Sequence, residues 1–199
     1  MFLFVAANGN SQSKKSSRFN TLKKLIPQGE VGRALDYGCG WGQFSNELKK
    51  KNYHVDAIDH SQNEIGVAKL VWGEQDKITF QQAKIQDFDS KVFDLVFSSQ
   101  VIEHVHNPGI YLSEINRVLK DEGTLIISLP NIVNPRFMLP MFLKRYKKRL
   151  FTANKKLLSD YNKMNDHING WDPLHFVHLV STVGFELIDY IPAEGVPFP

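Results

Sequence analysis

The segment that most constrains the fold of this chain is Ala34-Leu-Asp-Tyr-Gly-Cys-Gly-Trp-Gly-Gln-Phe44. A short apolar run ends at Asp36 and Tyr37, glycines then occupy alternate positions, and an amphipathic helix pattern follows. Glycine allows backbone dihedral angles that are closed to other residues and lets a ligand approach the backbone closely. A strand, a glycine turn and a helix in this order predict an open α/β sheet that binds a ligand beyond the carboxyl end of the strand.

Strand and helix patterns alternate along most of the chain. Strands are predicted at 33–37, 53–58, 78–81, 93–97, 124–129 and 185–191, and helices at 19–26, 42–50, 63–71, 108–119 and 173–183. This alternation predicts a Rossmann-like, doubly wound, mostly parallel sheet with helices on both faces. We expect a flexible polar lead-in at 8–17 and a turn at 121–123.

The composition is that of a folded domain, with 42% hydrophobic and 23% charged residues among 199. We therefore expect one domain over 1–199. The one cysteine, Cys39, excludes an internal disulfide, and no Cys/His run has zinc spacing, so no metal ion is predicted. No run approaches the roughly 18 apolar residues of a membrane span, and the apolar start lacks the flanks of a signal peptide. The expected location is the cytoplasm.

The charge is distributed unevenly. Residues 131–165 hold nine Lys and Arg against one acid, although the whole chain carries only +3. We predict that 131–170 form a basic helical insertion, in which an apolar stretch at 137–143 precedes five cations within 144–149. Three interpretations remain open. The insertion is a solvated lid over the active site, or it uses Phe137–Phe151 to contact a membrane surface or a lipid-linked substrate. The third interpretation is a site for another polyanion. Nucleic acid is disfavoured because no aromatic stacking platform accompanies the charge.

The details of the glycine turn indicate which ligand it binds. The spacing Gly38-x-Gly40-x-Gly42 departs from the dinucleotide fingerprint, whose third glycine would fall at Gln43. A side chain at Gly38 would fill the space that the ligand needs. Asp36 would repel a pyrophosphate but attract an ammonium group, and Asp59, 21 residues after Gly38, suits hydrogen bonds from ribose hydroxyls. The pattern favours an adenosine with an amino-acid tail and disfavours a dehydrogenase.

These residues, with Phe93-Asp-Leu-Val-Phe-Ser-Ser-Gln-Val-Ile-Glu-His-Val105, resemble the class I S-adenosylmethionine-dependent methyltransferases. The chain looks most like the group that contains the ubiquinone-biosynthesis O-methyltransferases and many bacterial glycan and natural-product enzymes. The resemblance covers 30–130 well and 165–191 loosely. It implies that S-adenosylmethionine is the cofactor, with adenine against 82–85, the methionine portion beside 98–100 and its carboxylate near Arg18. The residues it assigns to the cofactor are Arg18, Asp36, Gly38, Cys39, Gly40, Asp59, His60, Ser61, Ala83, Lys84, Ser98, Ser99 and Gln100.

The chain departs from this family in two places. Some relatives carry Glu-x-x-Glu-His after the fourth strand and bind a divalent metal there. This chain has Gln100-Val-Ile-Glu103-His104, in which an amide replaces the first carboxylate and weakens a site for a hard cation. The sheet of the family also usually ends in an antiparallel strand, for which nothing after Pro192 looks long enough, so the expected sheet is incomplete or the chain truncated.

Methyl transfer requires donor and acceptor to be held in line, and a hydroxyl acceptor must lose its proton. His104 and His167 are the candidate bases, because a histidine titrates near neutral pH. The alternative role for His104 is packing or capping of the helix near Asn107, and Ser61 suits a helix cap as well as an adenosine contact. We predict O-methylation of a hydroxyl on a small molecule or glycan. The alternatives are a quinone-pathway O-methyltransferase at the membrane surface and a catalytically silent cofactor-binding or partner subunit.

Overall fold

The computed structural model describes residues 2–7, 12–29, 32–73, 76–131 and 167–193. Its strands are β1 (Phe2–Ala7), β2 (Gly32–Tyr37), β3 (Tyr53–Asp59), β4 (Ile78–Gln82), β5 (Phe93–Ser99), β6 (Leu119–Pro130) and β7 (Leu187–Ala193). Its helices are α1 (Gln12–Leu25), α2 (Gln43–Lys50), α3 (Gln62–Trp72), α4 (Pro108–Val118) and α7 (Pro173–Thr182), and two 3₁₀ turns are η1 (Ile85–Asp87) and η2 (Ile102–His104). Among the described residues, no helix has the length and apolar character needed to cross a membrane.

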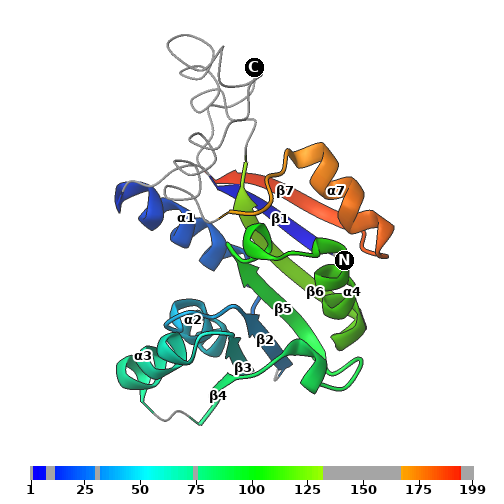
Figure 1. Cartoon of the computed structure of the whole chain (residues 1–199). Helices are drawn as coiled ribbons and strands as arrows, with labels where there is room; N and C mark the ends of the chain where they lie inside the picture. Colours follow the sequence, from blue (N-terminus) through cyan, green and yellow to red (C-terminus); the bar gives the residue numbers. More distant parts are fainter. Residues whose placement is uncertain (1, 8–11, 30–31, 74–75, 132–166, 194–199) are drawn as a thin grey trace, which may run out of the picture.

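The strands form one sheet in the order β4-β3-β2-β5-β6-β1-β7 (Figure 1). All of its described strand pairs are parallel. The chain order runs outward from β2 to β4 on one side and resumes with β5 and β6 on the other, so the sheet is doubly wound. The predicted Rossmann-like fold is confirmed, and β2 and β5 flank the point where the strand order reverses, which is where such sheets bind ligands.

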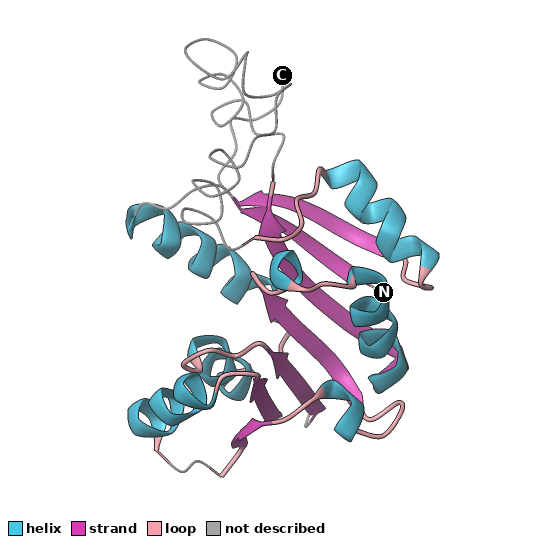
Figure 2. Ribbon diagram, viewed as in Figure 1, coloured by secondary structure: helices cyan, strands magenta, loops and turns pink. Residues whose placement is uncertain are grey.

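Helices cover both faces of the sheet (Figure 2). On one face, Leu22 of α1, Leu48 of α2 and Ile65 of α3 join a buried cluster. On the other face, α4 and α7 contribute a second cluster that includes Ile115 and Phe176. Strands that are buried on both faces need continuous apolar runs, and β5 and β6 have them.

The N-terminal strand was not predicted from the sequence. β1 lies between β6 and β7, and residues 2–7 pair in parallel with 125–130 on one side and with 187–193 on the other. No described strand is antiparallel, so the antiparallel strand usual in the family is absent from this part of the chain. A six-residue apolar run has no periodicity that separates strand from helix. Its place in the sheet is decided by the two neighbouring strands, which supply its backbone partners.

Two further expectations need correction. Helix α1 begins at Gln12, so residues 12–17 are helical rather than a flexible lead-in; residues 8–11 lie outside the described residues. The turn expected at 121–123 lies inside β6, where Phe93 pairs with Leu119 but Leu95 pairs with Thr124, so the intervening residues bulge from the ladder. Of the predicted insertion, 132–166 lie outside the described residues, including the apolar and cationic stretches of Phe137–Phe151.

Candidate cofactor and catalytic site

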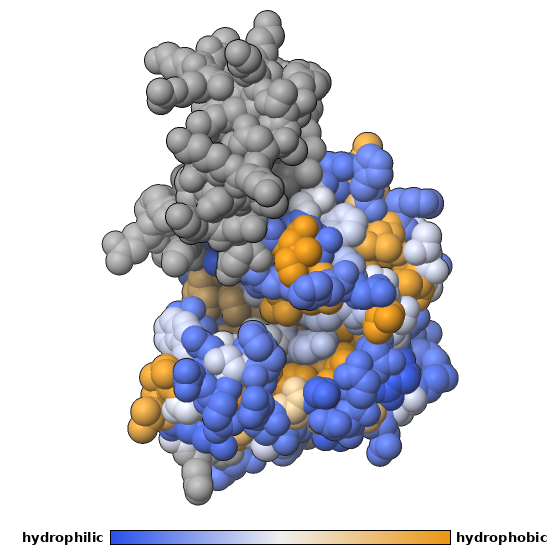
Figure 3. All heavy atoms as spheres, in the orientation of Figure 1, coloured by the Kyte–Doolittle hydropathy of each residue, from blue (hydrophilic) through white to orange (hydrophobic). Residues whose placement is uncertain are grey.

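Most of the predicted site residues lie at the carboxyl ends of β2, β3 and β5, which are neighbouring strands of the sheet. Ala83 and Lys84 follow β4, and Arg18 lies on α1. Figure 3 shows a hollow with apolar residues along its walls on the face that also displays α2 and α3. The fold therefore brings together segments that the sequence separates.

The glycine turn between β2 and α2 is built from three residues with positive φ: Gly38 at +78°, Gly40 at +51° and Gly42 at +84°. A Cβ on Gly38 would lie 2.3 Å from Val101 Cγ2. The position of a side chain at Gly38 is therefore filled by protein, which corrects the expectation that a ligand needs that space. A contact between the Gly38 backbone and the cofactor stays a prediction. A Cβ on Gly40 would meet nothing closer than Glu64 Oε2 at 3.7 Å, so Gly40 is the glycine that leaves its surroundings open to a ligand.

Asp36, at the end of β2, is 2% exposed, and its Oδ2 accepts a hydrogen bond of 2.5 Å from the Ser45 hydroxyl of α2. Burial raises the pKa of Asp36 to about 7, although the hydrogen bonds from Ser45 oppose the shift. The carboxylate thus ties the strand to the helix after the turn. Its attraction for a ligand ammonium group stays a prediction. Burial also raises the pKa of the Cys39 thiol, which makes Cys39 a small neutral residue of the turn.

Asp59, at the end of β3, links the glycine turn to the start of α3. Its Oδ2 accepts from the Gly40 amide at 3.0 Å, and its Oδ1 accepts from the Ser61 amide at 2.9 Å. A carboxylate oxygen has two lone pairs, so Oδ2 can accept a further hydrogen bond from a ribose hydroxyl. Ser61 caps α3 through the Glu64 amide, as predicted, and the ring of exposed His60 lies 3.2 Å from Asp59 Oδ1.

The loop predicted to contact adenine follows β4. Gln82 Nε2 donates to the His60 carbonyl at 2.9 Å, which joins this loop to the loop after β3. Ala83 packs against the core cluster, and the Lys84 amide donates to Asp87 Oδ2 at 2.9 Å at the start of η1. The loop therefore has a defined path beside the predicted ribose site.

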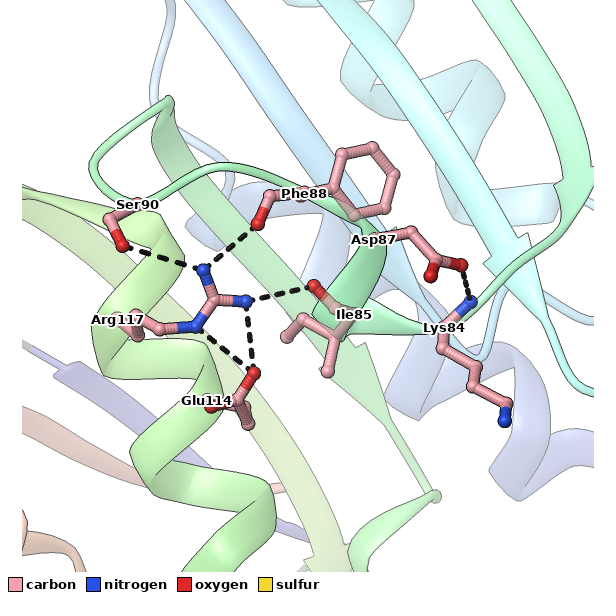
Figure 4. Close-up of polar contacts among 7 residues, drawn as sticks. All are labelled: Lys84, Ile85, Asp87, Phe88, Ser90, Glu114 and Arg117. Atoms are coloured by element: carbon pink, nitrogen blue, oxygen red, sulfur yellow. Dashed lines mark hydrogen bonds and ion pairs between the residues drawn. The ribbon is translucent and has the colours of Figure 1, made fainter.

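Arg117 of α4 holds the continuation of this loop (Figure 4). Its guanidinium donates to the Ile85 carbonyl at 3.1 Å and the Phe88 carbonyl at 2.9 Å. Glu114 accepts from the same guanidinium at 2.9 and 3.0 Å and orients it. Sequence reasoning missed Arg117 because nothing in a helical arginine indicates that its partners are carbonyls of a distant loop.

Two serines at the end of β5 are taken up by contacts within the protein. Ser98 is fully buried and shares a 2.7 Å hydrogen bond with the Tyr111 hydroxyl. Ser99 shares a 2.7 Å hydrogen bond with the Ser128 hydroxyl of β6. Their contact with the methionine portion of the cofactor stays a prediction.

Gln100 and Arg18 lie side by side at the same edge. Arg18 Nη1 of α1 donates to Gln100 Oε1 at 3.0 Å. Gln100 has a φ of +59°, and its amide donates to the Ser128 carbonyl at 2.8 Å. A positive φ is uncommon outside glycine and concentrates at ligand-binding positions. The sequence pointed to both residues separately, and the carboxylate-binding role of Arg18 stays a prediction.

The candidate bases also come together. The rings of His104 and His167 have centroids 4.9 Å apart at 79°. The segment after His167 is held on η2, because the amides of Ile168 and Asn169 donate to the Glu103 carbonyl at 2.8 and 2.9 Å. One ligand atom from each of Glu103, His104 and His167 lies within 4.8 Å of the other two. Residue spacing could not reveal this group, since His167 arrives only after the long connection that follows β6.

Residues 35–127 match the model of the methyltransferase domain family. These residues are therefore similar to the methyltransferase domain of S-adenosylmethionine-dependent methyltransferases. The chain is 31% identical over 135 residues to a ubiquinone biosynthesis O-methyltransferase of Rickettsia canadensis, an alignment that covers 67% of this chain and 54% of that protein. The chain spans about half the length of the curated relatives it matches.

Solved structures agree with this fold. An S-adenosylmethionine-dependent methyltransferase from Mesorhizobium loti superposes with a TM-score of 0.64 at 19% identity, covering 85% of this chain and 81% of that one. A phosphoethanolamine N-methyltransferase 2 from Haemonchus contortus, in complex with S-adenosyl-L-methionine, gives 0.64 at 19% identity over 90% of this chain and 38% of that one. At these identities the likeness establishes the fold of the methyltransferase domain.

Proposed function

We propose that this chain binds S-adenosylmethionine and transfers its methyl group to a hydroxyl oxygen of a small molecule. The observation that carries the proposal is the shared edge of the sheet, where the glycine turn and Asp59 lie on one side and the His104–His167 pair on the other. Cofactor and acceptor groups would thereby meet within one site. Holding two reactants in line is worth up to about 7–11 kcal/mol of the barrier.

In the proposed cofactor position, Asp59 accepts hydrogen bonds from the ribose hydroxyls, and the backbone around Gly40 lies against the adenosine and the amino-acid tail. Arg18 faces the methionine carboxylate. Asp36 favours the ammonium group through space, and its buried carboxyl is more readily ionised when a cation lies nearby. These contacts suit a cofactor that carries no phosphate.

The transfer is a direct displacement. The bond between sulfur and the methyl carbon breaks while the bond from that carbon to the acceptor oxygen forms, and the electron pair returns to sulfur, which becomes neutral. The acceptor proton passes to the His104 imidazole, and His167 lies against that ring. The expected products are S-adenosylhomocysteine and a methyl ether.

Calorimetry with S-adenosylhomocysteine and transfer of a labelled methyl group to a panel of hydroxylated acceptors test the proposal together. We expect saturable cofactor binding, and label in at least one aromatic or glycan hydroxyl. His104→Gln should lower turnover about 100-fold or more while cofactor affinity stays the same. His54→Gln, at an exposed position of β3, is the matched control and should retain turnover. Absence of cofactor binding would refute the proposal.

A quinone precursor is one acceptor to test, because the relatives that align with this chain carry the name ubiquinone biosynthesis O-methyltransferase. A polyprenylated catechol and a water-soluble catechol of the same ring should therefore be compared. Preference for the polyprenylated acceptor would identify the quinone-pathway reaction at a membrane surface. Cofactor binding without transfer to any acceptor would instead favour a silent cofactor-binding subunit.

A further inference from the structure

Two buried hydrogen-bond donors, in the segments that carry His104 and His167, have no hydrogen-bond partner among the described residues. They are Gln100 Nε2, just after β5, and Trp171 Nε1, just before α7. Most buried polar groups in proteins are paired, because a buried donor without an acceptor costs free energy. Two such donors beside the candidate bases therefore need an explanation.

Contacts within the protein fix the direction of the Gln100 amide. Its Oε1 accepts from Arg18 Nη1 at 3.0 Å, and a guanidinium can only donate, so Nε2 is directed away from this bond. The backbone at Gln100 has a φ of +59°, and its amide donates to the Ser128 carbonyl of β6 at 2.8 Å. Side chain and backbone are thus both held in place, as in a preorganised binding group.

The Trp171 indole is also held in place. Its backbone forms a parallel bridge with Asn131, the residue after β6. Its ring meets the ring of Phe176 edge-on, with centroids 5.7 Å apart. The next residue, Asp172, caps α7 by accepting hydrogen bonds from two amides of the first turn, each at 3.1 Å. The indole therefore has fixed neighbours, although its N–H makes no hydrogen bond to them.

The strand order places both donors at the far end of the site from the predicted ribose contact. The predicted cofactor contacts follow the strands from β4 through β3 and β2 to β5, and β6 is the next strand. Gln100 and Trp171 are both tied to the end of β6, at Ser128 and Asn131, which lie about 10 Å apart on an extended chain. The two candidate bases belong to the same segments. Both donors therefore lie on the side where the methyl acceptor is expected.

We propose that the methyl acceptor carries a carboxylate besides its reacting hydroxyl, and that Gln100 Nε2 and Trp171 Nε1 each donate a hydrogen bond to that carboxylate. A carboxylate only accepts hydrogen bonds and has two oxygens, so it can satisfy both donors at once. The Arg18 guanidinium beside Gln100 adds a fixed positive charge that favours an anion. This inference rests on the proposed methyl transfer, for which it names the substrate class.

The first experiment compares hydroxybenzoates, hydroxybenzamides and cresols, which carry a carboxylate, a neutral amide or a methyl group at the same ring positions. Calorimetry measures their binding to the full chain with S-adenosylhomocysteine, and labelled S-adenosylmethionine measures transfer. A site that hydrogen-bonds a substrate group rejects analogues without it, because its buried donors are then left unpaired. We expect at least one hydroxybenzoate to bind and to exceed its cresol about 100-fold in kcat/KM, with the amide between them. No binding of any hydroxybenzoate, or equal use of hydroxybenzoate and cresol, would overturn the inference.

The second experiment removes each donor in turn. Trp171→Phe deletes the indole N–H and keeps an aromatic ring, so we expect hydroxybenzoate binding about tenfold weaker with little change in melting temperature. Trp72→Phe is the matched control. Trp72 Nε1 donates to the Trp41 carbonyl at 2.8 Å, so this variant should lower the melting temperature and keep the preference for hydroxybenzoate over cresol. Unchanged hydroxybenzoate affinity in Trp171→Phe would contradict the role of the indole.

Gln100→Glu keeps an oxygen toward Arg18 but replaces the donor with an oxygen that repels a carboxylate, so the preference for hydroxybenzoate should be lost. A chelator is present, because this variant completes the Glu-x-x-Glu-His pattern. Weaker cofactor binding with an unchanged acceptor preference would place the Gln100 amide on the cofactor and contradict its proposed role. A native chain that does not bind S-adenosylhomocysteine would reject the proposed methyl transfer. Native cofactor binding and transfer without a carboxylate preference would reject only this inference.

Discussion

The two sides of the site are built in different ways. The side at the ends of β2 and β3 consists of two short segments, the glycine turn and the residues at Asp59. The Asp59 carboxylate joins them, because it accepts hydrogen bonds from the Gly40 and Ser61 amides. We call this the contiguous side. The side at the end of β5 brings together Arg18 of α1, the turn η2 and the segment that begins at His167. We call this the assembled side. The geometry of the contiguous side is set largely by local backbone dihedral angles. The geometry of the assembled side depends on how the whole sheet packs.

The difference has a functional consequence. The contiguous side presents backbone groups and carboxylates, which suit a cofactor of fixed structure. The assembled side presents Arg18, His104 and His167, and the last of these is reached through the connection after β6. Loops that a rigid scaffold positions are where binding specificity usually lies. We therefore expect acceptor preference to change more readily than cofactor preference.

We expect the largest effect on stability where the two sides meet, at the contact between Gly38 and Val101. In Gly38→Ala, the new Cβ meets Val101 Cγ2 at 2.3 Å and takes a strained positive φ, so we expect a loss of about 2–4 kcal/mol in the free energy of unfolding. Adding Val101→Ala should recover the steric part. Gly40→Ala is the matched control. We expect it to lower the free energy of unfolding by only about 1 kcal/mol and to reduce cofactor affinity. Urea denaturation and calorimetry measure both, and equal stability losses at the two glycines would contradict the packing difference.

Asp59→Ala tests the contiguous side directly. The change removes the acceptor of two amides and of the proposed ribose hydroxyls, and hydrogen bonds to a charged group are worth about 1.5–3 kcal/mol each. We expect the affinity for S-adenosylhomocysteine to fall about 100-fold, with turnover lost in proportion. Asp59→Asn, which keeps the shape and one acceptor oxygen, should fall less. Unchanged affinity in Asp59→Ala would remove the ribose assignment.

Arg117→Met tests whether α4, which belongs to neither side of the site, positions the loop after β4 that is predicted to contact adenine. The substitution keeps the aliphatic stem but releases the carbonyls of Ile85 and Phe88, so we expect about 1–3 kcal/mol lower stability and several-fold weaker cofactor binding. Lys91→Met breaks an exposed ion pair with Asp121 and should cost under about 1 kcal/mol. Thermal denaturation and calorimetry compare the two variants. Equal effects would mean that Arg117 is an ordinary surface cation.

The smallest expected effect is a pH dependence on the contiguous side. A ligand ammonium group favours the ionised form of Asp36, so binding below its pKa of about 7 must release a proton. Cofactor affinity should therefore rise about tenfold as the pH rises from about 6 to 7.5. Calorimetry in buffers of different ionisation enthalpy counts the protons released. In Asp36→Asn the rise should disappear; a rise that persists would assign it to another group.

Most of the described elements between 32 and 191 follow from sequence patterns, because alternating strand and helix periodicities leave few ways to bury the apolar residues. The exceptions share a physical cause. Strand β1 and the early start of α1 have weak local patterns, and their structure depends on what lies beside them. Residues 121–123 are of types common in turns, but the pairing of β5 with β6 continues on both sides of them, so they form a bulge within the strand.

The amino-acid sequence by itself determined the glycine turn and the acids that follow β2 and β3, because backbone dihedral limits and short-range hydrogen bonds act between residues close in the chain. Tertiary structure alone decided that Val101 fills the side-chain position at Gly38, that Arg117 holds the loop after β4, and that Glu103, His104 and His167 converge. Those contacts join segments far apart along the chain. Their distances depend on sheet order and helix packing, which no local pattern encodes.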